Sequence, residues 1–292
     1  MAEEQIVLPG AIVKKSNVLC RARWGVESVF EPRLVALVAA RVHQDDQDFQ
    51  MYEIPMRELT GDTNDGAKTY KIIESVTDSL MNKIITIRQE GSRSFAKYNV
   101  FSKCEYDEKT HVIRARFDPD LKPHYLGLKA KFTEYRLLEF LTLPSIYSQR
   151  IFEILKSWDD QPEVTLSLSD LHEMLNVPDS LQKDFAAFRR RVLEKAHKDI
   201  SSKTDLVYQW EPIRQGKGKA VTAIRFVFGL GEIAKMKESA KKQKQADYKP
   251  ALDCWQTKHR AKEECPIRQR GTGGRGKCKI CLERIAIEQF GV

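Results

Sequence analysis

The sequence of 292 residues contains no apolar run of eighteen residues or more, so no transmembrane helix and no membrane partner are predicted. Its first residues, MAEEQIVLPG, are acidic and have no long apolar stretch, which argues against a signal peptide. Cysteine is also scarce. The six cysteines, without an export signal, predict reduced thiols in the cytoplasm rather than a disulfide framework.

Motifs of common enzyme classes are missing as well. The six histidines are scattered (43, 111, 124, 172, 197 and 259) and form no His-x-His pair, which a metal-dependent nickase would need. A P-loop is excluded because Lys219 is followed by Ala220, and Ile213 stands where its first glycine should be. No G-x-S-x-G nucleophile motif occurs either. We therefore predict no catalytic activity and no required cofactor.

The net charge of +8 is concentrated at one end of the chain. Residues 235–292 carry 15 Lys and Arg against 7 Asp and Glu, whereas residues 1–234 carry 34 of each. Nucleic-acid binding by the main body must therefore depend on how its charges are arranged, because its bulk charge is zero. The apolar fraction of 41% is enough for buried cores, and the length suits about two domains.

One order of elements occurs twice. Helix, short helix, longer helix and β-hairpin is the order of a winged-helix unit. In the first half, helical spacing at 26–44, 56–61 and 68–83 precedes β-like runs at 84–89, 95–106 and 111–118. In the second half, helices at 143–158, 166–177 and 184–200 precede strands at 205–214 and 220–229. The predicted class is α+β: tandem winged-helix domains over 1–140 and 141–234, then a basic tail over 235–292.

The third helix of the second half, residues 184–200, has one apolar and one basic face. On a helical wheel the outer face gathers Lys183, Ala187, Arg190, Arg191, Glu194 and Lys198. Arg189 lies at the edge of the apolar face, where it can pair with an acid or extend along the core. Because the third helix of a winged-helix unit enters the major groove, we predict that this basic face contacts DNA. Small Ala187 would permit close approach; the alternative is an ordinary solvated face.

Two further pairs of lysines are candidates for DNA contact. Lys217 and Lys219 lie in the turn QGKGK between the two strands of the wing, where glycines let the backbone approach a phosphate. A plain basic hairpin tip is the alternative. Lys68 and Lys71 lie on the outer face of the third helix of the first half, which is as compatible with a solvated surface as with a secondary DNA contact.

Several runs of the second half match a known pattern. They are LPSIYSQRIFEILKSW, SDLHEMLNVP, FAAFRRRVLEKAHKDISSKTDL and the wing WEPIRQGKGKAVTAIRFVF. Together they cover about residues 141–230 and resemble the plasmid replication initiators of the Rep superfamily, which bind short direct repeats called iterons. Asn176 stands where a glycine is common in that family, and Asp199 and Ser201 replace its usual Glu and Asn. Residues 25–140 match the family's first domain in element order more than in motif.

The resemblance implies a function and partners. Monomers of such initiators bind iterons in double-stranded DNA, promote opening of an adjacent A·T-rich segment, and recruit the host initiator and replicative helicase. Homodimers joined largely through the N-terminal domain bind an operator and repress their own gene. The role of the family's recognition-helix arginines is carried over onto Arg189, Arg190 and Arg191 as a group. The expected location is the bacterial cytoplasm, in association with nucleoid or plasmid. The alternatives are an operator-binding transcription repressor without an origin role, and a protein-association scaffold.

The tail holds four of the six cysteines. Cys278 and Cys281 have the C-x-x-C spacing of a zinc knuckle, and Cys254 and Cys265 could complete a tetrahedral site, with His259 as a substitute ligand. The pattern predicts a structural zinc site, although zinc sites usually contain two tight pairs. Four reduced surface thiols on a basic tail are the alternative. The isolated Cys20 and Cys104 are interpreted as structural.

Overall fold

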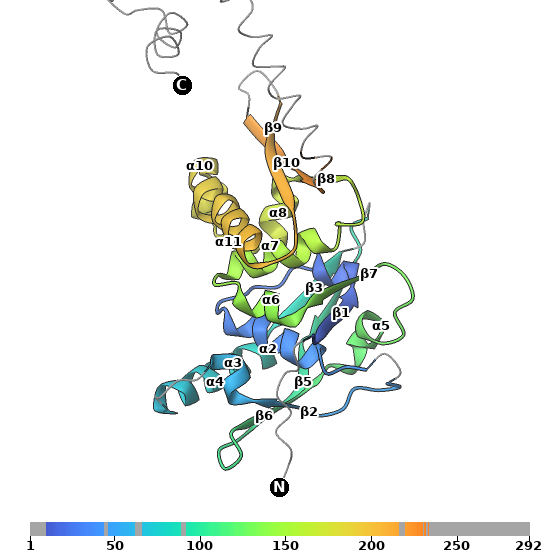
Figure 1. Cartoon of the computed structure of the whole chain (residues 1–292), viewed down its shortest axis with the longest axis vertical. Helices are drawn as coiled ribbons and strands as arrows, with labels where there is room; N and C mark the ends of the chain where they lie inside the picture. Colours follow the sequence, from blue (N-terminus) through green and yellow to red (C-terminus); the bar gives the residue numbers. More distant parts are fainter. Residues whose placement is uncertain are drawn as a thin grey trace, which may run out of the picture. The chain divides into compact units, whose positions relative to one another are not determined.

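The computed structural model describes residues 10–229 except 44–45, 62–65, 89–91 and 216–219, together with Gly231 and Ile233. Two three-stranded antiparallel sheets within it share one strand order, in which the first strand pairs with the last strand of the following hairpin (Figure 1). The first sheet has the order β2-β6-β5, from Tyr52–Pro55, Val112–Phe117 and Phe101–Asp107. The second has the order β8-β10-β9, from Glu163–Ser167, Ala220–Phe228 and Tyr208–Gln215. The repeated topology confirms the α+β fold with two winged-helix units.

The predicted helices occur in the predicted order, together with short helices that the sequence does not predict. The first unit contains α2 (Phe30–Ala39), α3 (Met56–Thr60) and α4 (Gly66–Met81). The second contains α7 (Ile146–Lys156), α8 (Leu168–Met174), α9 (Asp179–Gln182), and a long third helix made of α10 (Phe185–Phe188), the π-helical turn η2 (Arg189–Glu194) and α11 (Lys195–Lys203). Among the described residues, no helix is both long and apolar enough to cross a membrane.

Side-chain oxygens mark where the helices of the second unit begin. Ser145 accepts a hydrogen bond from the backbone N–H of Ser148 at the start of α7 (3.0 Å). Ser167 does the same for Asp170 at the start of α8 (3.0 Å). Each bond satisfies a backbone donor that has no partner within its own helix. The local sequence therefore places these helix ends.

The prediction of one strand over residues 95–106 is wrong. The chain forms two strands there, β4 (Phe95–Asn99) and β5, which belong to different sheets. β4 pairs with β3 (Ile84–Arg88), whereas β5 joins the wing. Between them Val100 is fully buried and its carbonyl accepts a hydrogen bond from Asp118 N–H (3.1 Å). This long-range anchor divides a run that looks continuous in the sequence.

Short elements outside the repeated pattern complete the first unit. Near the start of the chain, β1 (Ile12–Ser16) pairs antiparallel with the distant β7 (Phe132–Arg136). The remaining short helices are α1 (Asn17–Cys20), η1 (Pro119–Leu121), α5 (Lys122–Tyr125) and α6 (Leu137–Thr142). Sequence periodicity predicts neither strand of this ribbon, because each is only five residues long and is stabilised by pairing across the whole unit.

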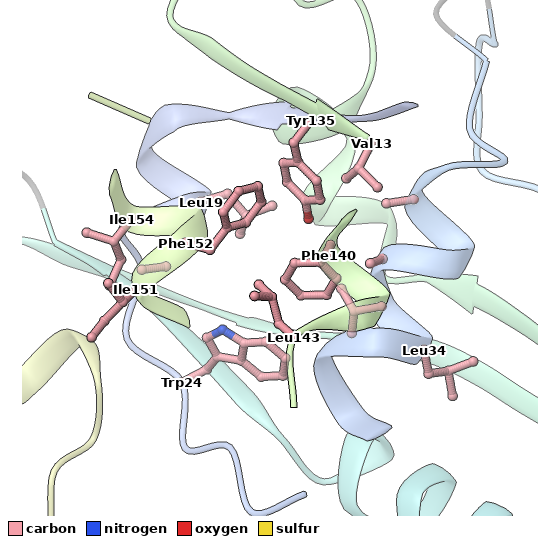
Figure 2. Packing of buried hydrophobic residues seen from close by; sticks show 14 of the residues in the cluster. Val13, Leu19, Trp24, Leu34, Tyr135, Phe140, Leu143, Ile151, Phe152 and Ile154 are labelled. Carbon is pink, nitrogen blue, oxygen red and sulfur yellow. The ribbon is translucent and has the colours of Figure 1, made fainter. Parts of the chain in front are cut away.

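α7 is buried on all sides. Every residue from Ser148 to Leu155 is buried, and Figure 2 shows Phe152 of α7 close to Tyr135 of β7 and Leu19 of α1. The rings of Tyr135 and Phe152 meet edge to face with centroids 5.3 Å apart. On its other side α7 contacts α11, where Ser148 Oγ donates to Asp199 Oδ2 (2.6 Å). α7 therefore connects the cores of the two units.

A charged cluster lies inside this core, defined here as the Glu153 cluster: Lys15, Tyr135, Arg150 and Glu153. Glu153 accepts hydrogen bonds from Lys15 Nζ, from Tyr135 OH (2.7 Å) and from Arg150 Nη1 (2.7 Å), and all four side chains are buried. Arg150 Nη2 also donates to the carbonyl oxygen of Ala22 (2.7 Å). Burial alone would raise the pKa of Glu153, but the two neighbouring cations outweigh it and keep the pKa below its usual value. The carboxylate is therefore charged.

Candidate nucleic-acid interface

The third helix of the second unit buries one side through a repeat of four residues. Phe188, Val192, Ala196 and Ile200 are all fully buried, and α11 lies beside the first strand of the wing (Figure 1), where the His197 ring contacts the carbonyl oxygen of Tyr208. At the N-terminus, Asp184 Oδ1 accepts a hydrogen bond from Ala187 N–H (3.0 Å). The packing leaves the opposite side of the helix in solvent.

Ala187 does not lie on that exposed side, so its predicted position in the middle of the basic face is wrong, and its contact with DNA stays a prediction that burial does not favour. The side chain is buried, with 8% exposure, and Ala186 is exposed instead. The cause is η2, because hydrogen bonds from residue i to i+5 make a wider turn than those of an α-helix. A wheel with constant α-helical periodicity does not include this turn and therefore misplaces the residues before it.

The predicted cations do lie on the exposed side. Lys183, Arg190, Arg191 and Lys198 are exposed, and within the described part of the chain none of them has an acidic partner. Some exposed arginines elsewhere do have an acidic partner: Arg88 Nε, for example, lies 2.7 Å from Glu173 Oε1. The third helix of the second unit, which we call the basic helix, thus carries positive charge that no acidic side chain among the described residues balances, an arrangement suited to a polyanion.

Arg189 differs from its two neighbours. Its Nε donates to Glu194 Oε1 (2.7 Å), with both side chains about half exposed. This is the acid pairing that its position at the edge of the apolar face suggested. Arg189 remains a predicted DNA contact, but its charge is partly balanced, whereas the charges of Arg190 and Arg191 are not.

Two lysines of the same surface were missed by sequence reasoning. Lys195 and Lys203 are exposed, and in the described residues neither has an acidic partner. They lie four and twelve residues after Arg191. This is the same four-residue spacing as that of the buried side chains from Phe188 to Ile200. That spacing was the signal available in the sequence. We define the basic row as Lys183, Arg190, Arg191, Lys195, Lys198 and Lys203.

The other predicted contacts are placed only in part. Lys217 and Lys219 lie outside the described residues, so their contact with phosphate stays a prediction. On α4 of the first unit, Lys68 and Lys71 are exposed as expected, opposite the buried Val76. Their contact with DNA also stays a prediction.

Comparison with known proteins identifies the family. The model of the first domain of a replication initiator family, "Initiator Replication protein, WH1", matches residues 12–156, and that of its second domain, "Initiator Rep protein, WH2", matches residues 167–228. The chain belongs to this family of replication initiators. The match to the family's first domain extends to residue 156 and so includes α7. The predicted boundary between the two domains, at residues 140 and 141, stays a prediction.

Two relatives extend the comparison. The "PI protein" of Escherichia coli is 23% identical over 150 residues, which are 46% of the initiator and 49% of that protein, so the chain spans about half the length of this curated relative. A solved structure described as "Crystal structure of Pi initiator protein in complex with iteron DNA" covers 77% of the initiator and 100% of its own chain, with a TM-score of 0.59 and 17% identity. The likeness supports the fold.

Asn176 retains the geometry for which the Rep superfamily often uses glycine. Its φ of 49° lies in the left-handed region, which glycine and asparagine adopt more readily than other residues. Val177 N–H donates to the carbonyl oxygen of His172 (2.9 Å), the six-to-one bond of a Schellman motif that ends α8. The replacement therefore keeps the turn between α8 and the basic helix.

His172 of α8 packs against the buried side of the basic helix. Its ring meets Phe188 edge to face (4.6 Å between centroids), and its Nε2 is buried with no hydrogen-bond partner. Burial lowers the pKa of His172. The folded chain consequently binds fewer protons than the unfolded chain at mildly acidic pH.

We expect the free energy of unfolding to decrease as the pH falls from about 7.5 to about 5.5, because the unfolded imidazole, with a pKa of about 6.5, then takes up a proton. His172→Phe should reduce this decrease, with His124, whose pKa burial also lowers, accounting for part of the remainder. Urea unfolding at several pH values measures the effect, and His43→Gln, at an exposed position, is the control. An equal decrease in His172→Phe and wild type would contradict the assignment.

The cysteines divide between the described and the remaining residues. Cys254, His259, Cys265, Cys278 and Cys281 lie outside the described residues, so the structural zinc site stays a prediction. In the described ranges no group of three His, Cys, Asp or Glu side chains could hold a metal ion. Cys20 is buried and Cys104 half-buried, and both are free thiols. Burial raises the pKa of Cys104 to about 12, so its thiol is not a ready nucleophile.

Proposed function

We propose that this initiator binds iterons, short direct repeats in double-stranded DNA at a plasmid origin, and starts replication there. The basic row carries the proposal: unbalanced cations on the third helix of a winged-helix unit, in a member of a replication initiator family. The fold likeness to a Pi initiator solved in complex with iteron DNA supports the choice of ligand.

The basic row suggests a division of roles. An arginine can bind guanine O6 and N7 with two hydrogen bonds, or it can pair with a phosphate. Arg190 and Arg191 lie near the N-terminal end of the helix, which is the part that contacts base edges in related docking geometries. Lys195, Lys198 and Lys203 lie farther along and suit the phosphate backbone, where they would position the helix without reading sequence.

Footprinting of wild-type protein on DNA from either side of its own coding sequence tests the proposal. We expect protected segments to recur as direct repeats, and affinity to fall steeply with salt because each neutralised phosphate releases counterions. Protection of an inverted repeat alone would instead indicate an operator-binding repressor. Absence of protection would indicate a protein-association scaffold.

We also propose later steps. Opening of an adjacent A·T-rich segment and recruitment of the host initiator and helicase rest on the resemblance of the second unit to Rep-superfamily initiators. No chemical step is included, in line with a family named for initiation rather than for a reaction.

A homodimer through the first unit is part of the same proposal, and the free edge of β4 supports it. β3 lies between β4 and Arg23, which bonds to the backbone of Thr86, so within the described part of the chain β4 has a partner strand on one side only. Phe95, at the start of β4, is 58% exposed. An unpaired strand edge next to an exposed aromatic side chain suits pairing with the same edge of a second copy. Such a dimer would repress the initiator's own gene at an operator.

Phe95→Lys should weaken this dimer about tenfold or more, because a charge would replace an aromatic contact beside the strand edge. Sedimentation velocity over a concentration series measures the dissociation constant. Leu138→Lys is the matched control, since Leu138 is 47% exposed on α6, outside β3 and β4. Equal weakening by both variants, or by neither, would exclude the β4 edge as the interface.

A further inference from the structure

One carboxylate of the second unit holds two guanidinium groups of the first. Glu173, on the last turn of α8, accepts a hydrogen bond from Arg88 Nε at the end of β3 (2.7 Å). Arg23 Nη1 lies 3.5 Å from the same carboxylate oxygen. The contact therefore joins residues far apart in the sequence and in different winged-helix units.

The backbone positions both arginines before they reach Glu173. Arg23 N–H donates to Thr86 O (3.0 Å), and Thr86 N–H donates to Arg23 O (2.8 Å), so this part of the chain lies alongside β3. Arg88 follows Thr86 by two residues on the same strand, so its side chain leaves the strand on the same face. The two positive charges thus converge at a place that the first unit determines by itself.

A close steric contact lies beside the ion pairs. A Cβ atom added to Gly25 would lie 3.1 Å from Nδ2 of Asn176, closer than an ordinary van der Waals contact. Gly25 therefore leaves room for the Asn176 side chain. We define the Glu173 seam as Arg23, Gly25, Arg88, Glu173 and Asn176.

The seam is one of several attachments between the units. Others lie along α7: Tyr135 OH of the first unit donates to Glu153 (2.7 Å), and Arg21 Nε donates to Ser157 Oγ at the end of α7 (2.8 Å). Contacts along one helix leave rotation about that helix possible, whereas the contact of α8 with Arg23 and Arg88 restrains it. Because α8 carries His172 against Phe188 of the basic helix, whatever holds α8 also orients that helix.

We propose that the Glu173 seam sets the angle between the two winged-helix units, so that their third helices meet DNA at one fixed spacing. Glu173, Gly25 and Asn176 are then positioning residues, and the inference rests on the DNA binding proposed above. The side chains of Arg88 and Glu173 are 53% and 30% exposed, and ion pairs this exposed add little to the stability of a fold. Removing the seam should therefore widen the range of angles between the units and leave both folds intact.

The first test compares binding to the repeat-containing fragment with binding to the same fragment carrying one base pair inserted within the protected segment. We expect wild type to lose at least about tenfold in affinity on insertion and Glu173→Gln only about two- to threefold. Both affinities come from one protein preparation, so their ratio does not depend on the fraction of folded protein. Glu163→Gln is the matched control, because Glu163 pairs with Arg225 inside the second unit and should keep the wild-type ratio.

The steric contact allows a rescue. Gly25→Ala should lower the insertion penalty toward that of Glu173→Gln, because the added methyl group displaces Asn176. Adding Asn176→Gly should restore the wild-type ratio, since glycine vacates the space and also suits the left-handed backbone there. A wild-type insertion penalty in Glu173→Gln, or no penalty in wild type, would overturn the proposal.

A second measurement needs no DNA. Spin labels on unnatural amino acids at Ser75 of α4 and Ser201 of α11, both exposed, report the distance between the units in the full chain. We expect a broader distance distribution in Glu173→Gln than in wild type or Glu163→Gln. An unchanged distance distribution would overturn the proposed role of the Glu173 seam without affecting the proposed function. Failure of the wild type to bind repeat DNA would overturn the proposed function.

Discussion

Replacing Arg190 and Arg191 together with alanine is expected to weaken binding to the repeat-containing DNA by about 100-fold or more. Each residue contributes an exposed charge that has no acidic partner in the part of the chain that the structure describes, and one good arginine contact to a base is worth about 1–3 kcal/mol. Mobility-shift titrations of wild type and double variant measure the loss. The double variant should remain folded, because neither side chain contributes to the core.

Two single variants serve as comparisons for the loss of DNA affinity in the double variant. Arg189→Ala should weaken binding less than either neighbouring single variant, because Glu194 already holds that guanidinium. Arg136→Ala removes an exposed arginine on β7 that pairs with Glu139, and should leave binding unchanged. If the double variant binds as tightly as wild type, the basic row is not the DNA interface. The salt dependence separates roles, because losing a phosphate contact reduces the slope by about one and losing a base contact does not.

Glu153→Ala is expected to reduce the free energy of unfolding by about 3–5 kcal/mol, the usual cost of leaving a buried charge without its partner. The variant leaves Lys15 and Arg150 in the core with no anion, and Tyr135 OH without an acceptor. Urea unfolding followed by circular dichroism measures the change. A loss of this size is a large fraction of the stability of an ordinary domain, so partial unfolding at 37 °C is expected as well.

A neighbouring ion pair provides the control. Lys14 of β1 pairs with Glu134 of β7 at 3.1 Å, on the two strands that also carry Lys15 and Tyr135. The Glu134 side chain, however, is 48% exposed. Glu134→Ala should therefore cost less than about 1 kcal/mol. Similar losses in both variants would mean that burial does not determine the importance of the Glu153 cluster.

Local sequence determined the order of the main helices in both units and the positive charge of the third helix in the second unit. Apolar residues at helical spacing, capping serines and glycine-containing turns act over a few residues, so they can be interpreted without knowing the rest of the fold. The same holds for the exposure of Arg190 and Arg191, since an arginine in an amphipathic helix rarely turns inward without a partner. The motifs that indicated the family are local runs too.

Only the tertiary structure decided how distant segments meet. The burial of Ala187 depends on a π-turn, and the division of residues 95–106 depends on a hydrogen bond from Asp118 to Val100. The ribbon of β1 and β7, the Glu153 cluster and the Glu173 seam each join residues far apart in the chain. A lysine or glutamate has the same local pattern on a surface and in a core, and its partner is chosen by the packing of whole elements. Contacts of this kind therefore emerge only when distant elements are folded against each other.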